Sequence, residues 1–260
     1  MIANYHTHTF RCGHASGTER EYIERAIENG IKIMGFSDHI PFRFPDGTES
    51  GFRVPTESAE EYVSALRGLK EEYKNDIEIH IGFESEYYPL YYGEMLANAV
   101  AWGAEYLILG QHFIGNEHPH GMYCGSRQNT SENLREYADT VVEAIKTGSF
   151  SYVAHPDVFF FGGSREEYIA EMRKICVASR QFGVPLEINL LGIRDNRHYP
   201  NELFWKLAGQ EGCTAVLGFD AHDVPSAFDG GSVPRALELA AENGIEVAER
   251  ITLRSLGSIH

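Results

Sequence analysis

The sequence lacks several features that define common protein classes. No apolar run reaches the roughly 18 residues that a membrane-spanning helix needs. The first residues, "MIANYHTH", show neither the basic start nor the apolar core of a signal peptide. No cluster of Lys or Arg is longer than a pair, and the net charge is −16, so a nucleic-acid partner is not expected. We therefore expect a cytoplasmic protein that binds neither membranes nor nucleic acid.

Cysteine is also scarce. The four cysteines are far apart and form no CxxC pair, which argues against a disulfide framework in a chain of 260 residues. Cys12 lies among histidines and could be a metal ligand by residue type, but histidine and carboxylate candidates outnumber it. The first strand–helix junction carries no G-x-G-x-x-G fingerprint, so a dinucleotide site is not expected either.

The chain instead contains a repeated alternation of short apolar runs and helical segments. Segments with apolar residues at helical spacing follow the runs, begin near Ser or Thr, and end at glycine. Strands alternating with helices predict a parallel sheet, and about seven units over residues 1–260 favour one α/β barrel domain over an open doubly wound sheet. Residues 245–255 either add an eighth strand or cover an edge. The apolar runs are "IANYH", "IKIMGFS", "IEIHIGFE", "AEYLILGQH", "FSYVAH", "PLEINLL" and "TAVLGFD".

Ionisable residues mark the end of nearly every predicted strand. In a parallel barrel these ends share one face, where barrel enzymes build their sites. One histidine at a strand end is usually structural, but this many ionisable groups need a counter-charge, which divalent metal ions supply. Imidazole and carboxylate ligands suit zinc, iron or manganese, in a cluster of two or three ions. The residues, strand by strand, are His6 and His8; Asp38 and His39; Glu84 and Glu86; His112; His155; Glu187 and Asn189; Asp220 and His222.

Several of these polar residues have more than one interpretation. Asp38 either orients a histidine or makes a helix N-cap or loop hydrogen bond. Glu86 is either an outer partner of a ligand or a contact for a substrate ammonium group. Glu187 and Asn189 are expected to point to opposite faces of their strand, so that at most one of them reaches the site.

The segments "HTHTFRCGHASG", "GFSDHIPF", "GFESEYYP", "AHPD" and "GFDAH" resemble the polymerase-and-histidinol-phosphatase (PHP) superfamily, and its histidinol-phosphate phosphatase branch most of all. The resemblance implies a distorted (β/α)7 barrel that holds three divalent metals. Amidohydrolases have a similar barrel, but they place a lysine at the end of strand four, where this chain has Gln111 and His112. By the resemblance, one metal takes His6, His8, Glu84 and Asp220, a second takes His14, His39 and His222, and a third takes Glu84, His112 and His155, so that Glu84 bridges two ions.

The resemblance also implies an activity. A phosphate ester would be drawn to a positively charged centre, where metal-activated hydroxide attacks phosphorus. Histidinol phosphate would then be hydrolysed to histidinol and phosphate, as in histidine biosynthesis. The alternatives are another small ester, such as a nucleotide or sugar phosphate, or a metal-binding module without activity. The oligomeric state stays open. The expected catalytic residues are Glu84, Asp220, His222 and Arg194, and the expected phosphate-binding residues are Arg194, Arg197 and His198.

Overall fold

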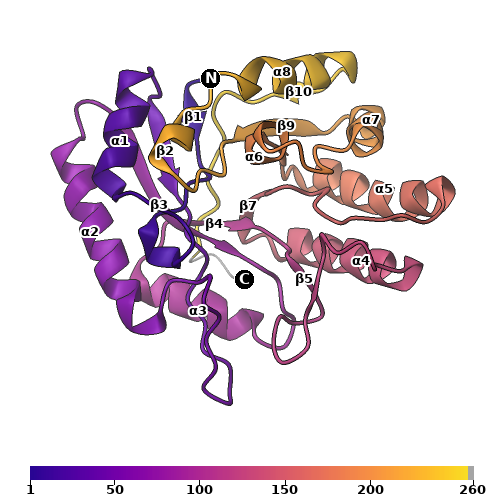
Figure 1. Ribbon diagram of the computed structural model, residues 1–260, viewed down its shortest axis with the longest axis horizontal. Coiled ribbons are helices and arrows are strands. Elements are labelled where there is room, and N and C mark those ends of the chain that lie inside the picture. The colour runs from indigo at the N-terminus through magenta and orange to yellow at the C-terminus, as the bar shows by residue number, and fades with distance from the viewer. Residues whose placement is uncertain (257–260) are drawn as a thin grey trace.

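The computed structural model describes residues 1–256 and places a ring of parallel strands inside a ring of helices (Figure 1). Strands that follow one another in the chain are neighbours in one eight-stranded sheet, interrupted only by a separate hairpin after the fourth strand. Each of the seven predicted strands forms. The main sheet consists of β1 (Ala3–Asn4), β2 (Ile33–Phe36), β3 (Glu78–Ser85), β4 (Tyr106–Leu109), β7 (Phe150–Val153), β8 (Leu186–Asn189), β9 (Thr214–Gly218) and β10 (Glu246–Val247).

The helices cover the outside of the sheet in chain order (Figure 1). None of those within residues 1–256 is both long and apolar enough to cross a membrane. The helices are α1 (Glu19–Glu28), α2 (Ala59–Glu72), α3 (Tyr92–Trp102), α4 (Ser131–Thr147), α5 (Arg165–Phe182), α6 (Leu190–Arg194), α7 (Glu202–Glu211) and α8 (Ser232–Glu242), with 3-10 turns η1 (Phe10–Cys12), η2 (Thr56–Ser58) and η3 (Val224–Ala227), and the hairpin of β5 (Phe113–Ile114) and β6 (Met122–Tyr123).

The helix ends follow local sequence signals. Thr18 and Glu21 form a full capping box at the start of α1, in which each side chain bonds the other residue's backbone. Ser164 caps α5 by accepting a hydrogen bond from the Glu167 amide. Ser58 precedes α2 and is followed three residues later by Glu61, as in a capping box, but its side chain makes no cap bond, because η2 runs directly into α2.

The carboxyl ends of the first and ninth strands meet and close the ring on that side. Thr7 forms a parallel bridge with Ala221, and the His8 amide donates a hydrogen bond to the Ala221 carbonyl at 2.9 Å. The Phe219 amide donates to Asn4 Oδ1 at 2.9 Å. This closure brings the residues after β1 beside the residues after β9, although most of the chain lies between them in the sequence.

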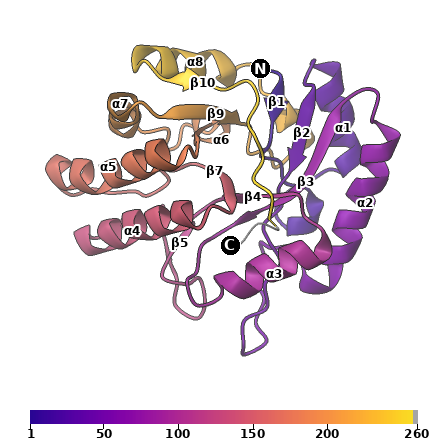
Figure 2. The same ribbon diagram turned by 180° about the vertical axis from the view of Figure 1, so that it is seen from behind.

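The C-terminal segment closes the opposite end. It adds the eighth strand, β10, to the edge of β9, and then crosses the amino ends of the strands (Figure 2). Ile251 and Leu253 pack there against the buried cluster inside the ring, which includes Tyr106 and Tyr152. The segment therefore both extends the sheet and covers the amino end of the barrel.

Candidate metal centre

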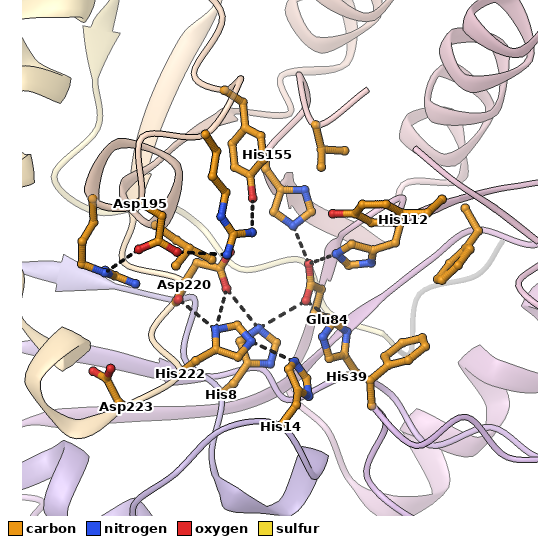
Figure 3. Close-up of a pocket in the computed structure, with 18 residues that line it drawn as sticks. His8, His14, His39, Glu84, His112, His155, Asp195, Asp220, His222 and Asp223 are labelled. Carbon is orange, nitrogen blue, oxygen red and sulfur yellow. Dashed lines mark hydrogen bonds and ion pairs between the residues drawn. The ribbon is translucent and has the colours of Figure 1, made fainter. Parts of the chain in front are cut away.

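A pocket of about 470 Å³ opens at the carboxyl ends of the strands (Figure 3). His6 lies beneath its floor and is fully buried. His198 is outside the pocket, where its Nε2 bonds the Val158 carbonyl at 2.7 Å. The other expected site residues line it: His8, His14, His39, Glu84, His112, His155, Arg194, Arg197, Asp220 and His222.

Four ligand atoms at the floor surround one point. His6 Nε2 is 3.1 Å from His8 Nε2. Each of these two nitrogens is 3.3 to 3.5 Å from a Glu84 oxygen and 3.4 Å from Asp220 Oδ1. A tetrahedral ion with ligands at about 2.0–2.1 Å has ligand–ligand edges of roughly 3.3–3.4 Å. The five ligand–ligand distances are close to these edges, so the four side chains suit a divalent transition metal.

The two oxygens of Glu84 face different groups of histidines. Oε2 lies 3.3 Å from His8 Nε2 and 3.2 Å from His39 Nδ1. Oε1 lies 2.9 Å from His155 Nε2 and 3.5 Å from His112 Nε2. One carboxylate between two sets of imidazoles is the geometry that a ligand bridging two ions requires.

A third group lies at the pocket mouth. His14 Nε2 and His222 Nε2 are 3.0 Å apart, and the rings of His14 and His39 are stacked with centroids 5.3 Å apart. These three residues are the set that the resemblance assigns to one ion. They are nearer to solvent than the floor, since His222 is a quarter exposed.

Hydrogen bonds behind the pocket turn the histidines toward it. A ligand histidine usually donates its other ring N–H to a carboxylate or carbonyl, which orients the ring. Four of the histidines have such a partner on Nδ1, which leaves Nε2 free to bind an ion. The pairs are His6 with Glu187 (2.9 Å), His112 with Glu86 (2.8 Å), His14 with the Cys12 carbonyl (3.1 Å) and His222 with the Asp220 carbonyl (3.1 Å).

The expectation that Glu187 and Asn189 face opposite ways is wrong. Residues two apart on a strand point to the same face. Glu187 bonds His6, and Asn189 Nδ2 donates both to Glu187 Oε1 (2.7 Å) and to Asp220 Oδ2 (3.0 Å). Asn189 therefore holds the carboxylate of Asp220 in place.

The structure also selects among the interpretations of Asp38 and Glu86. Asp38 accepts hydrogen bonds from the Thr9 amide (2.7 Å) and hydroxyl (2.8 Å). It thereby fixes the chain just after His8, whose Nδ1 is 4.0 Å away. Glu86 is fully buried and bonds His112, so it is an outer partner of a histidine and out of reach of a substrate.

The carboxylates of the pocket are ionised, but its histidines fall into two groups. Burial would lower the pKa of His6 and of His8, but neighbouring acidic groups raise both well above the usual value, so these two rings must release a proton to bind an ion. Burial alone would raise the pKa of Glu84 and of Asp220, but the neighbouring histidines hold both well below the usual range. Burial lowers the pKa of His39 well below its usual value and that of His222 to about 3. Charged carboxylates and neutral imidazoles are the forms that coordinate metal ions.

Strained backbone angles and two glycines also occur at the pocket. His155 and Asp220 have positive φ angles of 29° and 47°, in a region that non-glycine residues rarely adopt outside functional sites. A methyl group on Gly110 would lie 1.9 Å from Glu84 Oε1, and one on Gly218 would lie 2.1 Å from Glu187 Oε2. Because glycine has no side chain, these two positions leave room for the carboxylates of Glu84 and Glu187.

A mixed wall of charged and aromatic residues stands beside the ligands. Arg194 lines the pocket, and its buried Nη1 makes no hydrogen bond within the described residues but lies 3.7 Å from Asp229 Oδ2. Arg197 bonds the Tyr199 hydroxyl and Asp195, each at 3.0 Å. Of the non-arginine part of this wall, the sequence pointed only to Phe113 and Asp223, which closely follow histidines at predicted strand ends. It missed the rest, because nothing in a loop's residue pattern shows which side chains turn inward. The non-arginine part comprises Phe52, Phe113, Tyr123, Val158, Leu191, Asp195, Tyr199 and Asp223.

The fold and the pocket define an α/β barrel that carries a histidine- and carboxylate-rich metal site at the carboxyl ends of its strands. The family model for the PHP domain matches residues 4–190. The chain therefore belongs to the PHP domain family. Two of the proposed ligands, Asp220 and His222, lie beyond the matched segment.

Relatives and solved structures extend the likeness over most of the chain. The histidinol-phosphatase of Bacillus subtilis is 28% identical over 259 residues, which cover 86% of this chain and 96% of the relative. A protein of Deinococcus radiodurans named "Probable histidinol-phosphatase" is 27% identical over 229 residues, with 85% and 86% covered. A histidinol phosphate phosphatase of Lactococcus lactis, solved with zinc, L-histidinol and phosphate, superposes with a TM-score of 0.74 at 21% identity, covering 100% of this chain and 98% of that one. That structure shares the fold.

Proposed function

We propose that this protein is a metal-dependent phosphomonoesterase that hydrolyses L-histidinol phosphate to L-histidinol and phosphate. The observation that carries the proposal is the set of four ligand atoms from His6, His8, Glu84 and Asp220, spaced as a tetrahedral ion requires. Relatives named histidinol-phosphatase that match along most of the chain support the choice of substrate.

The proposed centre holds three divalent ions of zinc, iron or manganese. The second set would be His14, His39 and His222, and the third would be His112 and His155 with Glu84 shared. Divalent ions bound there lower the pKa of water toward neutrality and offset the charge of phosphoryl oxygens.

The protein's own residues supply position and charge. Glu84 and Asp220 are held ionised among the histidines, and Asn189 fixes the direction of the Asp220 carboxylate at 3.0 Å. Arg194 lines the pocket, and its guanidinium is only loosely paired with Asp195 and Asp229, each at 3.7 Å. It is therefore suited to a phosphoryl oxygen, because a guanidinium can donate two parallel hydrogen bonds to phosphate. Arg197 is partly engaged with Asp195 and Tyr199, so its contribution would be to hold that wall.

The size and lining of the pocket agree with a small substrate that has a phosphate at one end and a ring at the other. About 470 Å³ accommodates a molecule of this size. The rings of Phe52 and Phe113 are stacked with centroids 5.9 Å apart, and Phe113 meets Tyr123 edge to face at 6.0 Å. These aromatic side chains offer surfaces on which an imidazole can stack.

Turnover of a panel of phosphate esters tests the proposal. The purified protein is stripped of metal, reloaded separately with manganese, zinc or iron, and assayed with histidinol phosphate, a nucleoside monophosphate and a sugar phosphate. We expect metal-dependent release of phosphate with the highest kcat/KM for histidinol phosphate. A higher kcat/KM for another ester would overturn the substrate, and full metal binding with no turnover of any ester would overturn the activity.

A further inference from the structure

Arg53 is a buried arginine outside the pocket. It lies in the loop of residues 37–55 between β2 and η2, and its side chain is 1% exposed. Its Nε donates to Glu117 Oε1 at 2.9 Å, Nη1 donates to the Ile40 carbonyl at 3.0 Å, and Nη2 donates to Glu86 Oε2 at 2.5 Å and also to Glu117 Oε2. Burying a guanidinium is costly unless it is paired in this way.

The contact with Glu86 links Arg53 to the centre. Glu86 is fully buried, and its second oxygen, Oε1, accepts a hydrogen bond from His112 Nδ1 at 2.8 Å. His112 Nε2 in turn lies 3.5 Å from the bridging carboxylate of Glu84. Arg53 thus fixes one oxygen of Glu86, and the direction of the other oxygen sets the orientation of the His112 ring.

The contact with Glu117 links Arg53 to the pocket wall. Glu117 belongs to the turn between β5 and β6, and it also accepts hydrogen bonds from the Tyr88 hydroxyl at 3.0 Å and from Ser50. The two strands of this hairpin carry Phe113 and Tyr123, which line the pocket. One guanidinium therefore holds both an outer partner of a histidine and the base of an aromatic wall.

We propose that Arg53 is a positioning residue for the metal centre. Acting through Glu86, it orients His112 for the ion shared with Glu84 and His155, and acting through Glu117 it fixes the hairpin. Arg53 contacts neither ion nor substrate. The inference rests on the proposed metal centre.

The charges of the network favour the same role. One guanidinium faces two buried carboxylates, from Glu86 and Glu117, so the three groups together carry one negative charge. A divalent cation at His112 would offset that charge, and the network and the ion would stabilise each other. A lysine would keep the positive charge of Arg53, but its single nitrogen lacks the fork that reaches both carboxylates at once.

Metal binding to the stripped protein tests the inference without using turnover. Four variants are compared with the unaltered chain by titration calorimetry with manganese or zinc: Arg53→Lys, Glu86→Gln, the double variant, and Glu117→Gln. The matched control is Arg20→Lys, because Arg20 makes a forked pair with Glu72 on the exposed surface. Thermal unfolding of each protein checks that it folds.

We expect Arg53→Lys and Glu86→Gln each to weaken the binding of one ion by roughly 10- to 100-fold, as removal of an outer partner of a ligand does. The double variant should bind metal no more weakly than the weaker-binding single variant, because both residues act on the same histidine, His112. Glu117→Gln should keep metal affinity and raise KM. Arg20→Lys should match the unaltered chain.

Three results would overturn the role of Arg53. The first is wild-type metal affinity and kcat in Arg53→Lys. The second is a double variant whose loss is the sum of the single losses, since the two residues would then act independently. The third, decisive even if Arg53→Lys does not fold, is wild-type metal affinity in Glu86→Gln. Failure of the unaltered chain to bind metal would instead overturn the proposed function together with this inference.

Discussion

Replacing Glu84 by glutamine tests the proposed bridge directly. The carboxylate is 1% exposed and presents one oxygen to His8 and His39 and the other to His155 and His112. The amide of glutamine has only one oxygen, so in either orientation an NH2 group, which cannot bind a metal ion, replaces a ligand on one side. At least one ion should be lost whichever way the amide turns.

The expected magnitude follows from the position of the change. Loss of an outer partner weakens metal binding by 10- to 100-fold, so loss of a direct ligand should cost about 100-fold or more, or about 3 kcal/mol of binding free energy. Bound metal is counted by plasma mass spectrometry, and kcat is measured by phosphate release. We expect both to fall together in Glu84→Gln.

A matched control lies on the same strand. Glu78 begins β3 at the opposite end of the barrel, about half exposed, and pairs there with Arg250 at 3.1 Å. Glu78→Gln should keep full metal content and rate. If Glu84→Gln did the same, the bridge and the centre built on it would be refuted.

Four other changes have defined outcomes. Gly110→Ala should displace the Glu84 carboxylate, 1.9 Å from the new methyl group, and lower metal content, whereas Gly93→Ala in α3 meets nothing within 4 Å and should bind metal normally. Arg194→Lys should raise KM by about tenfold, since lysine cannot make the forked contact with phosphate; steady-state kinetics measure this. Chelation should lower the melting temperature, and added metal should restore it, because bound ions stabilise only the folded chain; circular dichroism follows this. Burial alone would raise the pKa of Glu105, but hydrogen bonds from a histidine and a lysine bring it to about 2. The stability that ionised Glu105 contributes is therefore present above about pH 4.5 and is lost toward pH 2. Glu105→Gln should lower the free energy of unfolding by about 1 kcal/mol or less at pH 7, and by progressively less as the pH falls. Urea titrations measure this.

The strand ends could be predicted from the sequence because the barrel makes them equivalent. Apolar runs indicated the strands, and the residue types after each run then indicated what the open end contains. His8 and Asp220 could be placed together in this way although they are far apart in the chain. Their contact depends on the strand order, which follows the chain.

The loops could not be predicted on the same basis. Periodicity does not describe a loop, so His198 was expected in the pocket and instead bonds the Val158 carbonyl. Arg53 gave no signal beyond a charge between Phe52 and Val54, since its partners Glu86 and Glu117 come from distant segments. The face of Asn189 could have been predicted, because the two-residue period of a strand decides it.

The bridge between Thr7 and Ala221 has a consequence for how the protein matures. His6 and His8 are synthesised before Asp220, and the set of ligands that they share with it is complete only after more than 210 further residues have been made. Until then the early histidines have no partner across the seam, and an ion bound to them would have too few ligands to be retained. We therefore expect metal loading to be a late event that coincides with closure of the ring, so that tight metal retention reports a fully assembled barrel.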